Sequence, residues 1–238
     1  MIRLGLTQRV EVVEAYGERR DCLDQAWTEL LEGWGYTPVP LATTVETPRE
    51  YLDQFDLDGV ILTSGNDLAH IDDAANPAPE RDAFEMAAVA WALDRGVPVL
   101  GVCRGVELLN RYFGGSLDSV DDHVDTTHSV SFGSDSWIEA QLGRSTPETS
   151  SAETESKPRL DRVEWPNKID VNSYHDYGIF EDAVGDELVA VGTAPDDTIE
   201  CLIHPDHLVV GIMWHPERET PTTDFDRQLF AALFGRGT

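Results

Sequence analysis

Cys103 is the residue of this sequence best placed to act as a nucleophile. It is the centre of Gly-Val-Cys-Arg-Gly at residues 101–105, between an apolar run at residues 97–101 and a helical pattern at residues 104–113. In such a sequence the glycines allow a tight turn from strand to helix, which presents the central side chain at the carboxyl edge of a sheet. The turn strains the central residue, and a place at a helix N-terminus favours a thiolate. Taken alone, the same residues also fit a buried cysteine in a glycine-rich turn.

A base and an acid stand at the end of a second apolar run, residues 208–213, which leads into His215-Pro216-Glu217. Residues two apart on an extended chain point to the same side, and a proline between them keeps the segment out of a helix. Glu217 can therefore hold His215 in one tautomer, as a general base requires. An isolated His-Pro-Glu would be a surface turn, but together with Cys103 it predicts a cysteine-dependent enzyme.

Strand-length apolar runs alternate with helical patterns in the first half of the chain. Such alternation predicts an α/β fold with a mostly parallel sheet and helices on both of its faces. After residue 116 the apolar runs are short and separated by turns, which predicts antiparallel additions. The expected strands are Ile2–Leu6 and residues 37–41, 59–63, 97–101, 128–132, 162–165, 187–191, Ile199–Ile203 and 208–213, and the expected helices are residues 21–34, Pro79–Arg95, residues 104–113 and Asp224–Phe234.

Residues 143–158 are poor in apolar side chains and rich in Ser, Thr, Glu and Pro. This composition predicts an exposed, mobile loop. Because the segments on both sides of the loop belong to one core, residues 1–238 are expected to form a single domain.

The net charge of the chain indicates which environment and which partners it suits. Forty-five acidic residues against 17 lysines and arginines give a formal charge of −28, and only two of the cations are lysines, Lys157 and Lys168. So large a charge is tolerable where salt screens it, which indicates a halophilic, salt-rich cytoplasm. It argues against nucleic-acid binding, which needs a basic surface. The sequence has no membrane-spanning apolar run, no signal peptide and no disulfide framework, so we expect a cytoplasmic protein.

The motifs around these residues are similar to those of the class I glutamine amidotransferases, and most to the γ-glutamyl hydrolase branch, which includes γ-glutamyl-γ-aminobutyrate hydrolases. The resemblance runs through most of the chain and implies a flavodoxin-like, doubly wound sheet. It also implies a Cys-His-Glu triad of Cys103, His215 and Glu217 that cleaves a γ-glutamyl amide through a thioester, with no cofactor and no metal. It rests on Gly-Val-Cys-Arg-Gly at 101–105, Leu-Leu-Asn at 108–110, Gly-Gly-Ser-Leu at 114–117, Trp-His-Pro-Glu at 214–217, Leu-Thr-Ser-Gly-Asn-Asp at 62–67, Arg-Asp-Ala-Phe-Glu at 81–85, His-Ser-Val at 128–130 with His123, and Val-Asn-Ser-Tyr-His at 171–175.

The same resemblance implies an oxyanion hole made of the backbone N–H groups of Arg104 and Gly65, while the Arg104 side chain is expected to be solvated. The chain departs from the family pattern at two places. Ser64-Gly65 replaces a common Gly-Gly, which makes the second oxyanion donor less certain than the nucleophile. Glu107 replaces a usual glutamine, and its carboxylate near the site is expected to change the preference for the leaving group.

Arginines after the first strand suggest an anionic substrate. Arg9, Arg19, Arg20 and Tyr16 lie close together in a chain with few cations, and guanidinium groups bind phosphate or carboxylate well. We therefore take Arg19 and Arg20 as candidate substrate-binding residues, although they also fit solvation of a helix start. This stretch resembles a subgroup assigned to γ-glutamyl-CDP-amidate hydrolysis. His175 is a further candidate, with a pocket and a structural role equally open.

The remaining histidines and cysteines are expected to have no part in the chemistry. Asp121, Asp122, His123, Asp125 and His128 could hold a metal, but acids are abundant throughout the chain and no complete ligand set is evident, so we expect no metal site. His70, His204 and His207 are expected to be solvated loop residues. Cys22, on the apolar side of its helix, and Cys201, in a strand, are expected to be core residues, and Trp214 to pack beneath His215.

Two other functions remain open from sequence. The chain could be a glutaminase subunit that supplies ammonia to a partner synthase, although Cys-Arg-Gly suits the hydrolase branch better. It could also be a non-catalytic regulatory member, against which the complete triad argues. A small-molecule γ-glutamyl substrate is the expected partner, and a homodimer is open.

Overall fold

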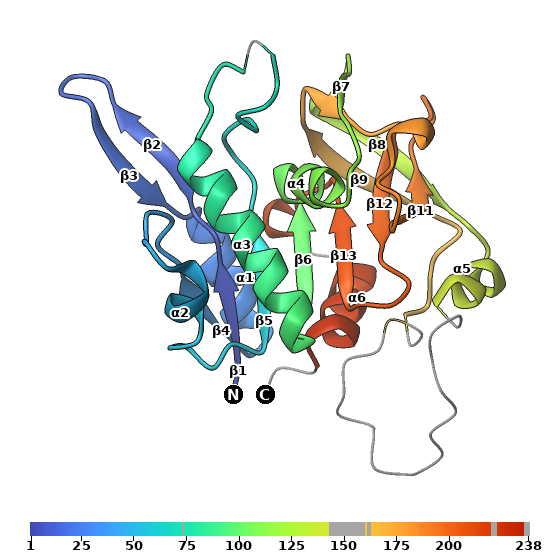
Figure 1. Ribbon diagram of the computed structural model, residues 1–238. Coiled ribbons are helices and arrows are strands. Elements are labelled where there is room, and N and C mark those ends of the chain that lie inside the picture. Colours follow the sequence, from blue (N-terminus) through green and yellow to red (C-terminus); the bar gives the residue numbers. More distant parts are fainter. Residues whose placement is uncertain (73, 143–159, 161–162, 220–222, 236–238) are drawn as a thin grey trace.

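A mixed sheet organises the molecule, and its order explains which residues meet. In the computed structural model, which describes residues 1–72, 74–142, 160, 163–219 and 223–235, nine strands follow the order β4-β1-β5-β6-β13-β12-β11-β8-β9 (Figure 1). The first five are parallel in the flavodoxin order 2-1-3-4-5, and the other four are antiparallel. Their bounds are β4 Tyr36–Pro40, β1 Ile2–Leu6, β5 Gly59–Leu62, β6 Val99–Val102, β13 Val209–Ile212, β12 Ile199–Ile203, β11 Val189–Thr193, β8 Val124–Phe132 and β9 Lys168–Tyr174.

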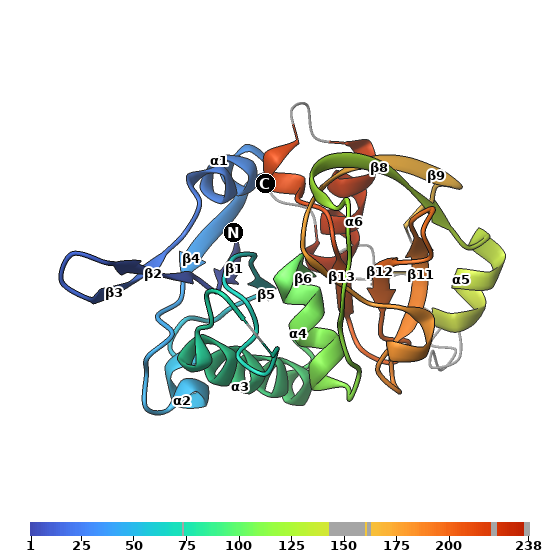
Figure 2. The ribbon, with the colours of Figure 1, turned by 90° about the horizontal axis from the view of Figure 1, so that it is seen from above.

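Helices cover both faces of the parallel half. Figure 2 shows α2 (Pro48–Leu52), α3 (Pro79–Arg95) and α4 (Arg104–Tyr112) on one face, and α1 (Gln25–Gly33) and α6 (Asp224–Phe234) on the other. Each face has its own apolar cluster. Residues of β6 alternate between them, since Leu100 and Val102 face one cluster and Val99 the other. This doubly wound architecture with antiparallel additions confirms the expected fold class.

Two paired glycines bring α4 close to the sheet. Gly101 of β6 and Gly211 of β13 are register partners. A Cβ on Gly101 would lie 2.5 Å from the Gly105 carbonyl oxygen, and one on Gly211 would lie 2.2 Å from Cγ2 of Val106. Any larger residue at either position would push the helix away, so these glycines set how deeply the start of α4 sits against β6.

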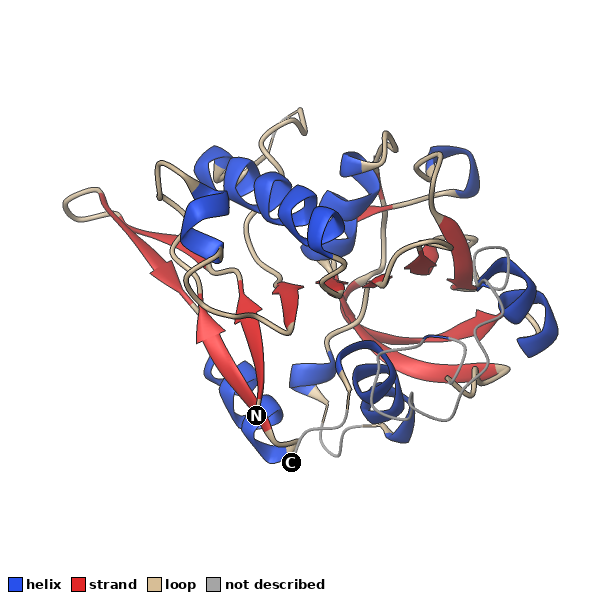
Figure 3. Ribbon diagram, turned by 60° about the horizontal axis from the view of Figure 1, so that its bottom comes forward, coloured by secondary structure: helices blue, strands red, loops and turns tan. Residues whose placement is uncertain are grey.

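A hairpin replaces the beginning of the helix expected at residues 21–34. Strands β2 (Arg9–Val13) and β3 (Glu18–Cys22) pair with each other and project from the sheet (Figure 3). Helix α1 starts only at Gln25, after Asp24, whose carboxylate accepts a hydrogen bond from the Ala26 N–H. Cys22 therefore ends a strand and is half-buried, and its expected place on the apolar side of a helix was wrong.

Most other expected elements are present within a few residues. The strand expected at residues 162–165 is wrong, because Val163 and Trp165 are buried in irregular chain and β9 begins only at Lys168. The loop expected at residues 143–158 lies outside the described residues. Sequence patterns also missed short elements, α5 (Asp135–Leu142), β7 (Asp118–Ser119), β10 (Tyr177–Gly178) and the 3-10 turns Glu181–Ala183 and Pro216–Arg218. None of the helices in the described part of the chain is long and apolar enough to cross a membrane.

Candidate active site

The turn expected at Cys103 is present between β6 and α4. Cys103 has φ 52° and ψ −112° at the N-cap of α4, and its N–H donates to the Ile212 carbonyl at 2.8 Å. A positive φ is costly for a residue with a Cβ, so the surrounding structure holds this turn in place. Gly105 makes it possible, because a Cβ there would lie 2.2 Å from the Leu62 carbonyl oxygen of β5.

The Cys103 thiol is held in its neutral form. Burial raises the pKa of this thiol above its usual value, the Glu107 carboxylate raises it further, and a hydrogen bond from the Arg104 N–H lowers it. Burial therefore outweighs the helix-terminus effect that was expected to favour a thiolate. A nucleophile in this state needs a base that removes its proton during the reaction.

His215 and Glu217 form a buried pair at the end of β13. His215 Nδ1 lies 2.8 Å from Glu217 Oε1, so Nδ1 carries the proton and donates to the carboxylate. The other ring nitrogen, His215 Nε2, is buried without a hydrogen-bond partner in the structure. Because β13 and β6 are parallel neighbours, with Ile212 opposite Val102, His215 and Cys103 follow their strands at the same edge of the sheet.

Strand β9 holds His215 from the antiparallel half. The Asn172 side chain binds both main-chain groups of His215. The ring of Tyr174 meets the His215 imidazole edge-on, with ring centroids 5.4 Å apart. The Arg218 guanidinium lies over the Tyr174 ring, 4.8 Å from its centroid. Asn172 and Tyr174 belong to the Val-Asn-Ser-Tyr-His motif, but their role was not predictable, because nothing local in the sequence links residues 172–174 to His215. Trp214 is buried as expected and donates to Asp226.

The loop after β5, which contains the second expected oxyanion donor, is organised by one buried arginine. The Arg81 guanidinium donates to the carbonyl oxygens of Thr63 at 2.5 Å, of Ser64 at 3.1 Å, and of Gly65. A trans peptide points its C=O and N–H in opposite directions. Because the Ser64 carbonyl points towards Arg81, the Gly65 N–H of the same peptide points away from Arg81. Gly65 has φ +83°, a conformation that favours glycine.

Arg104 belongs to the same buried network. Its guanidinium binds Glu85 and Asp82, while Arg81 binds the other oxygen of Glu85 at 2.8 Å. The expectation that the Arg104 side chain is solvated was wrong, since it is buried and faces α3. Its backbone N–H, in contrast, lies at the Cys103 thiol, where an oxyanion donor would be needed. The i, i+4 spacing of Arg81 and Glu85 was a visible signal in the sequence.

Glu107 is buried one turn into α4. Burial raises its pKa to about 7, the His175 and Arg104 charges lower it, and Asp67 and Asp176 raise it again. Its influence on the thiol of Cys103 places it beside the candidate nucleophile. A carboxyl group that is half protonated at neutral pH can donate or accept a hydrogen bond there.

His175 lies in a buried cluster with His123, His128 and Glu200. Burial lowers the pKa of His175, but the Glu200 carboxylate, 3.5 Å from its Nε2, raises it more, so the net shift is upward. Glu200 was missed, although a single acid inside the apolar strand Ile-Glu-Cys-Leu-Ile was a signal. Cys201 beside it is buried, as expected.

His204 differs from its expected role. It is buried rather than solvated, and its Nδ1 accepts the N–H groups of Asp206 at 3.0 Å and His207 at 3.2 Å. It closes the turn between β12 and β13. His70 and His207 are exposed, as expected.

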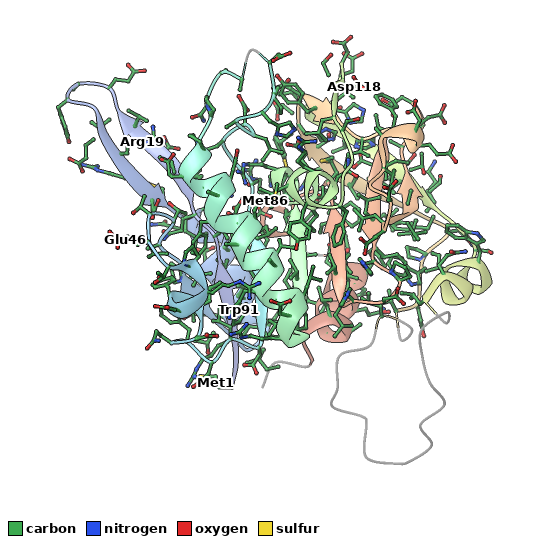
Figure 4. The ribbon with its side chains drawn as sticks, in the orientation of Figure 1. Met1, Arg19, Glu46, Met86, Trp91 and Asp118 are labelled. Atoms are coloured by element: carbon green, nitrogen blue, oxygen red, sulfur yellow. The ribbon has the colours of Figure 1, made fainter. Side chains whose placement is uncertain are left out.

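Arg19 and Arg20 lie on the β2–β3 hairpin and not at a strand-to-helix connection. Figure 4 shows Arg19 on the side of α3 opposite to α4. Arg19 pairs with Glu80, and Arg20 with Glu18 at 2.6 Å. Arg9 at the base of the hairpin is nearer, because its side chain packs against Gly65.

The fold, the strained cysteine turn and the buried His-Glu pair define a domain of the class I glutamine amidotransferase type. The chain belongs to the peptidase C26 family, whose model matches residues 4–217. It is 28% identical over 219 residues to the γ-glutamyl-CDP-amidate hydrolase of Campylobacter jejuni, covering 91% of this chain and 90% of that protein. It is 25% identical over 241 residues to the γ-glutamyl-γ-aminobutyrate hydrolase of Escherichia coli O157:H7, covering 90% and 85%.

A solved structure agrees on the fold. A glutamine amidotransferase from Thermotoga maritima superposes with a TM-score of 0.61 at 16% identity, covering 97% of this chain and 81% of that one. These comparisons confirm the family that the sequence motifs indicated.

Proposed function

We propose that this protein hydrolyses a γ-glutamyl amide through a γ-glutamyl thioester on Cys103. One observation carries the proposal: His215 is fixed in the tautomer of a general base, with its free Nε2 buried at the edge of the sheet where a neutral, strained Cys103 stands. Base-assisted attack requires a thiol that carries its proton and an imidazole nitrogen that can accept it.

The reaction follows from these groups. Cys103 Sγ bonds to the γ-carbonyl carbon as its proton passes to His215 Nε2, and Glu217 stabilises the imidazolium. The carbonyl oxygen becomes an oxyanion that the N–H groups of Arg104 and Gly65 stabilise. Collapse breaks the C–N bond, and His215 gives its proton to the leaving amine. Water, deprotonated by His215, then attacks the thioester and releases glutamate and the thiol.

The substrate we propose first is a γ-glutamyl-CDP-amidate, with γ-glutamyl-γ-aminobutyrate second. The name of the relative from Campylobacter jejuni contains the first substrate, and the name of the relative from Escherichia coli contains the second. The leaving amines of both substrates carry negative charge. An amine that bears a phosphate or carboxylate is also the kind of group that the arginines near the first strand would bind.

The test is a side-by-side assay of γ-glutamyl-CDP-amidate, γ-glutamyl-γ-aminobutyrate and glutamine in molar salt. We expect turnover of one of the first two, with glutamine much slower. Cys103→Ala should lower kcat by on the order of 10⁴–10⁶-fold without loss of the fold. Cys201→Ala, a buried cysteine outside the site, is the control and should retain turnover. Equal activity of Cys103→Ala and wild-type protein would disprove the mechanism.

A further inference from the structure

Three histidines and one glutamate bring their ligand atoms to a common point. His123 precedes β8, His128 lies on β8, His175 follows β9 and Glu200 lies on β12. One nitrogen or carboxylate oxygen of each lies within 4.8 Å of the others. Zinc–ligand bonds of 2.0–2.1 Å in a tetrahedron place neighbouring ligand atoms about 3.3 Å apart. The separations from Glu200 Oε1 are 3.5 Å to His175 Nε2, 3.7 Å to His128 Nε2 and 3.8 Å to His123 Nδ1.

The outer hydrogen bonds fix the tautomers of two of these rings. His175 Nδ1 lies 2.8 Å from the Tyr177 carbonyl oxygen and must donate to it, which leaves a lone pair on Nε2. His123 Nε2 lies 2.8 Å from the Asp196 carboxylate and must donate there, which leaves a lone pair on Nδ1. The two lone pairs face each other at 3.1 Å. Two neutral rings in this arrangement repel, so a cation or an additional proton is needed between them.

A proton alone leaves much of the cluster unsatisfied. Both carboxylate oxygens of Glu200 and both ring nitrogens of His128 are buried without a hydrogen-bond partner, and Glu200 is only 1% exposed. A buried carboxylate without partners is costly. A metal ion would give Glu200, one ring nitrogen of His128 and the two facing lone pairs a common partner.

We infer that His123, His128, His175 and Glu200 bind one divalent transition-metal ion, Zn²⁺ by preference, in a closed four-ligand site. Three imidazoles and one carboxylate are ligands that suit zinc, and four protein ligands leave no open position for catalysis. The outer partners have the form that metal-bound histidines use, since one ring donates to a carboxylate and another to a backbone carbonyl. No metal was expected here, because acids are abundant throughout the chain and the segment at residues 121–128 contains no complete ligand set; His175 and Glu200 come from distant strands.

The ion would fasten the curved, antiparallel half of the sheet. Strand β11 lies between β12 and β8 in the sheet order, so Glu200 reaches the histidines across the curve that Figure 2 shows. The ion would thereby fix the end of β9, which carries Asn172 and Tyr174 to His215. Its role is to position these residues, and it takes no part in the chemistry.

The direct test uses the full-length Cys103→Ala protein, in which the candidate nucleophile cannot compete as a ligand and no activity is needed. After chelation, dialysis against Zn²⁺ and removal of free metal, elemental analysis should find one zinc per chain. With Co²⁺ in place of zinc, the intense visible absorption of a tetrahedral site should appear. Absence of bound metal, or a weak octahedral Co²⁺ spectrum, would overturn the inference. Because neither measurement uses turnover, failure here leaves the proposed hydrolysis standing, and the converse also holds.

An outer-shell variant avoids disturbing the core. Asp196→Asn keeps Oδ1 for Thr198, which it binds at 2.7 Å, but replaces the carboxylate that orients His123. It should weaken Zn²⁺ binding by about 10–100-fold in a chelator competition. Asp197→Asn, an exposed neighbour, is the matched control and should bind as the parent does. Equal zinc affinity for both variants would show that His123 is not a ligand.

The variant Glu200→Gln distinguishes a cluster that binds a metal ion from a cluster that binds an additional proton. It should reduce the bound zinc well below one per chain, while His70→Gln, which changes an exposed histidine, should not. If the parent instead binds no zinc and the cluster holds a protonated His175, the inference is wrong.

Discussion

Asn172 binds the main chain of His215 at two points: its side-chain oxygen accepts the His215 N–H at 2.8 Å, and its amide donates to the His215 carbonyl at 2.9 Å. A residue of the antiparallel β9 thus fixes the backbone of the candidate base on the parallel side. We expect Asn172→Ala to lower kcat by about 10–100-fold, because a small displacement of a catalytic group is costly. Steady-state kinetics measure this, with exposed Asn167→Ala as control. Unchanged kcat would show that the backbone clamp is dispensable.

Even the conservative substitution Arg81→Lys should impair activity. One ammonium cannot replace a guanidinium that serves Glu85 and three loop carbonyls at once. We predict that Arg81→Lys lowers kcat by about 10²–10³-fold with little change in KM, as expected when an oxyanion donor is misplaced. Arg95→Lys on the exposed end of the same helix is the control. Similar kinetics for both variants would mean that the loop keeps its shape without Arg81.

Glu107 should make stability depend on pH. Burial raises its pKa from 4.5 to about 7, so the fold disfavours the ionised form. Its contribution is fully present below pH 4.5, declines as the pH rises towards 7 and is lost above that, a change of about 3 kcal/mol in the free energy of unfolding. Glu107→Gln should therefore stabilise the protein relative to wild type more at pH 8 than at pH 5. Denaturant unfolding at both values measures this, and an equal difference at both would contradict the shift.

The hairpin arginines should matter for anionic substrates only. Their ion pairs with Glu80 and Glu18 are exposed, and such pairs are weak enough to be exchanged for a phosphate. We predict that Arg19→Gln or Arg20→Gln raises KM for an anionic γ-glutamyl amide by about 10–100-fold, the equivalent of one or two charged hydrogen bonds. Hydrolysis of an uncharged γ-glutamyl anilide is the control and should hardly change. An equal effect on both substrates would assign these arginines to the fold.

Salt should stabilise the whole protein. With a formal charge of −28, lowering the salt from 1 M to 0.1 M lengthens the Debye distance from about 3 Å to about 10 Å and restores repulsion between surface carboxylates. We expect Tm to fall on this dilution, as measured by circular dichroism. KCl and NaCl should act alike, since the effect is screening. A constant Tm would contradict the halophilic interpretation.

The parallel half of the fold was predictable because its signals are local. Ile2–Leu6, Pro79–Arg95 and Asp224–Phe234 match their expected bounds, since helix starts, glycine stops and apolar runs lie within each segment. The hairpin at residues 9–22 was not predictable in the same way, because its strands are largely exposed and polar. Two-stranded pairing there depends on contacts with distant residues, such as Asn66 with Val10 and Asp21 with Thr43.

The residues of the candidate site also differ in whether local sequence motifs could predict them. Cys103 and the His215-Glu217 pair could be found from the sequence, because each motif contains its own turn. Asn172 acts on His215, 43 residues away in the chain, and no local pattern links the two. The Arg81–Glu85 spacing and the acid in the strand around Glu200 were local signals, but the burial that gives Arg81 and Glu200 their importance comes from other elements. The solvated roles assigned to Arg104 and His204 were wrong for the same reason, since a charged side chain is buried only when partners from other elements surround it.

The position of β13 in the sheet has a consequence for how the enzyme is made. A ribosome releases β1, β4, β5 and β6 before β13, and this nascent sheet has β6 as an open edge until β13 inserts between β6 and β12. Cys103 is then already translated, but His215 and Glu217 are not. The strand that closes the aggregation-prone edge is thus the strand that leads to the candidate base, so under the proposed mechanism the sheet is completed and the nucleophile gains its base in one event. Under the proposed mechanism, chains that stop before β13 lack the base, and their β6 edge stays open.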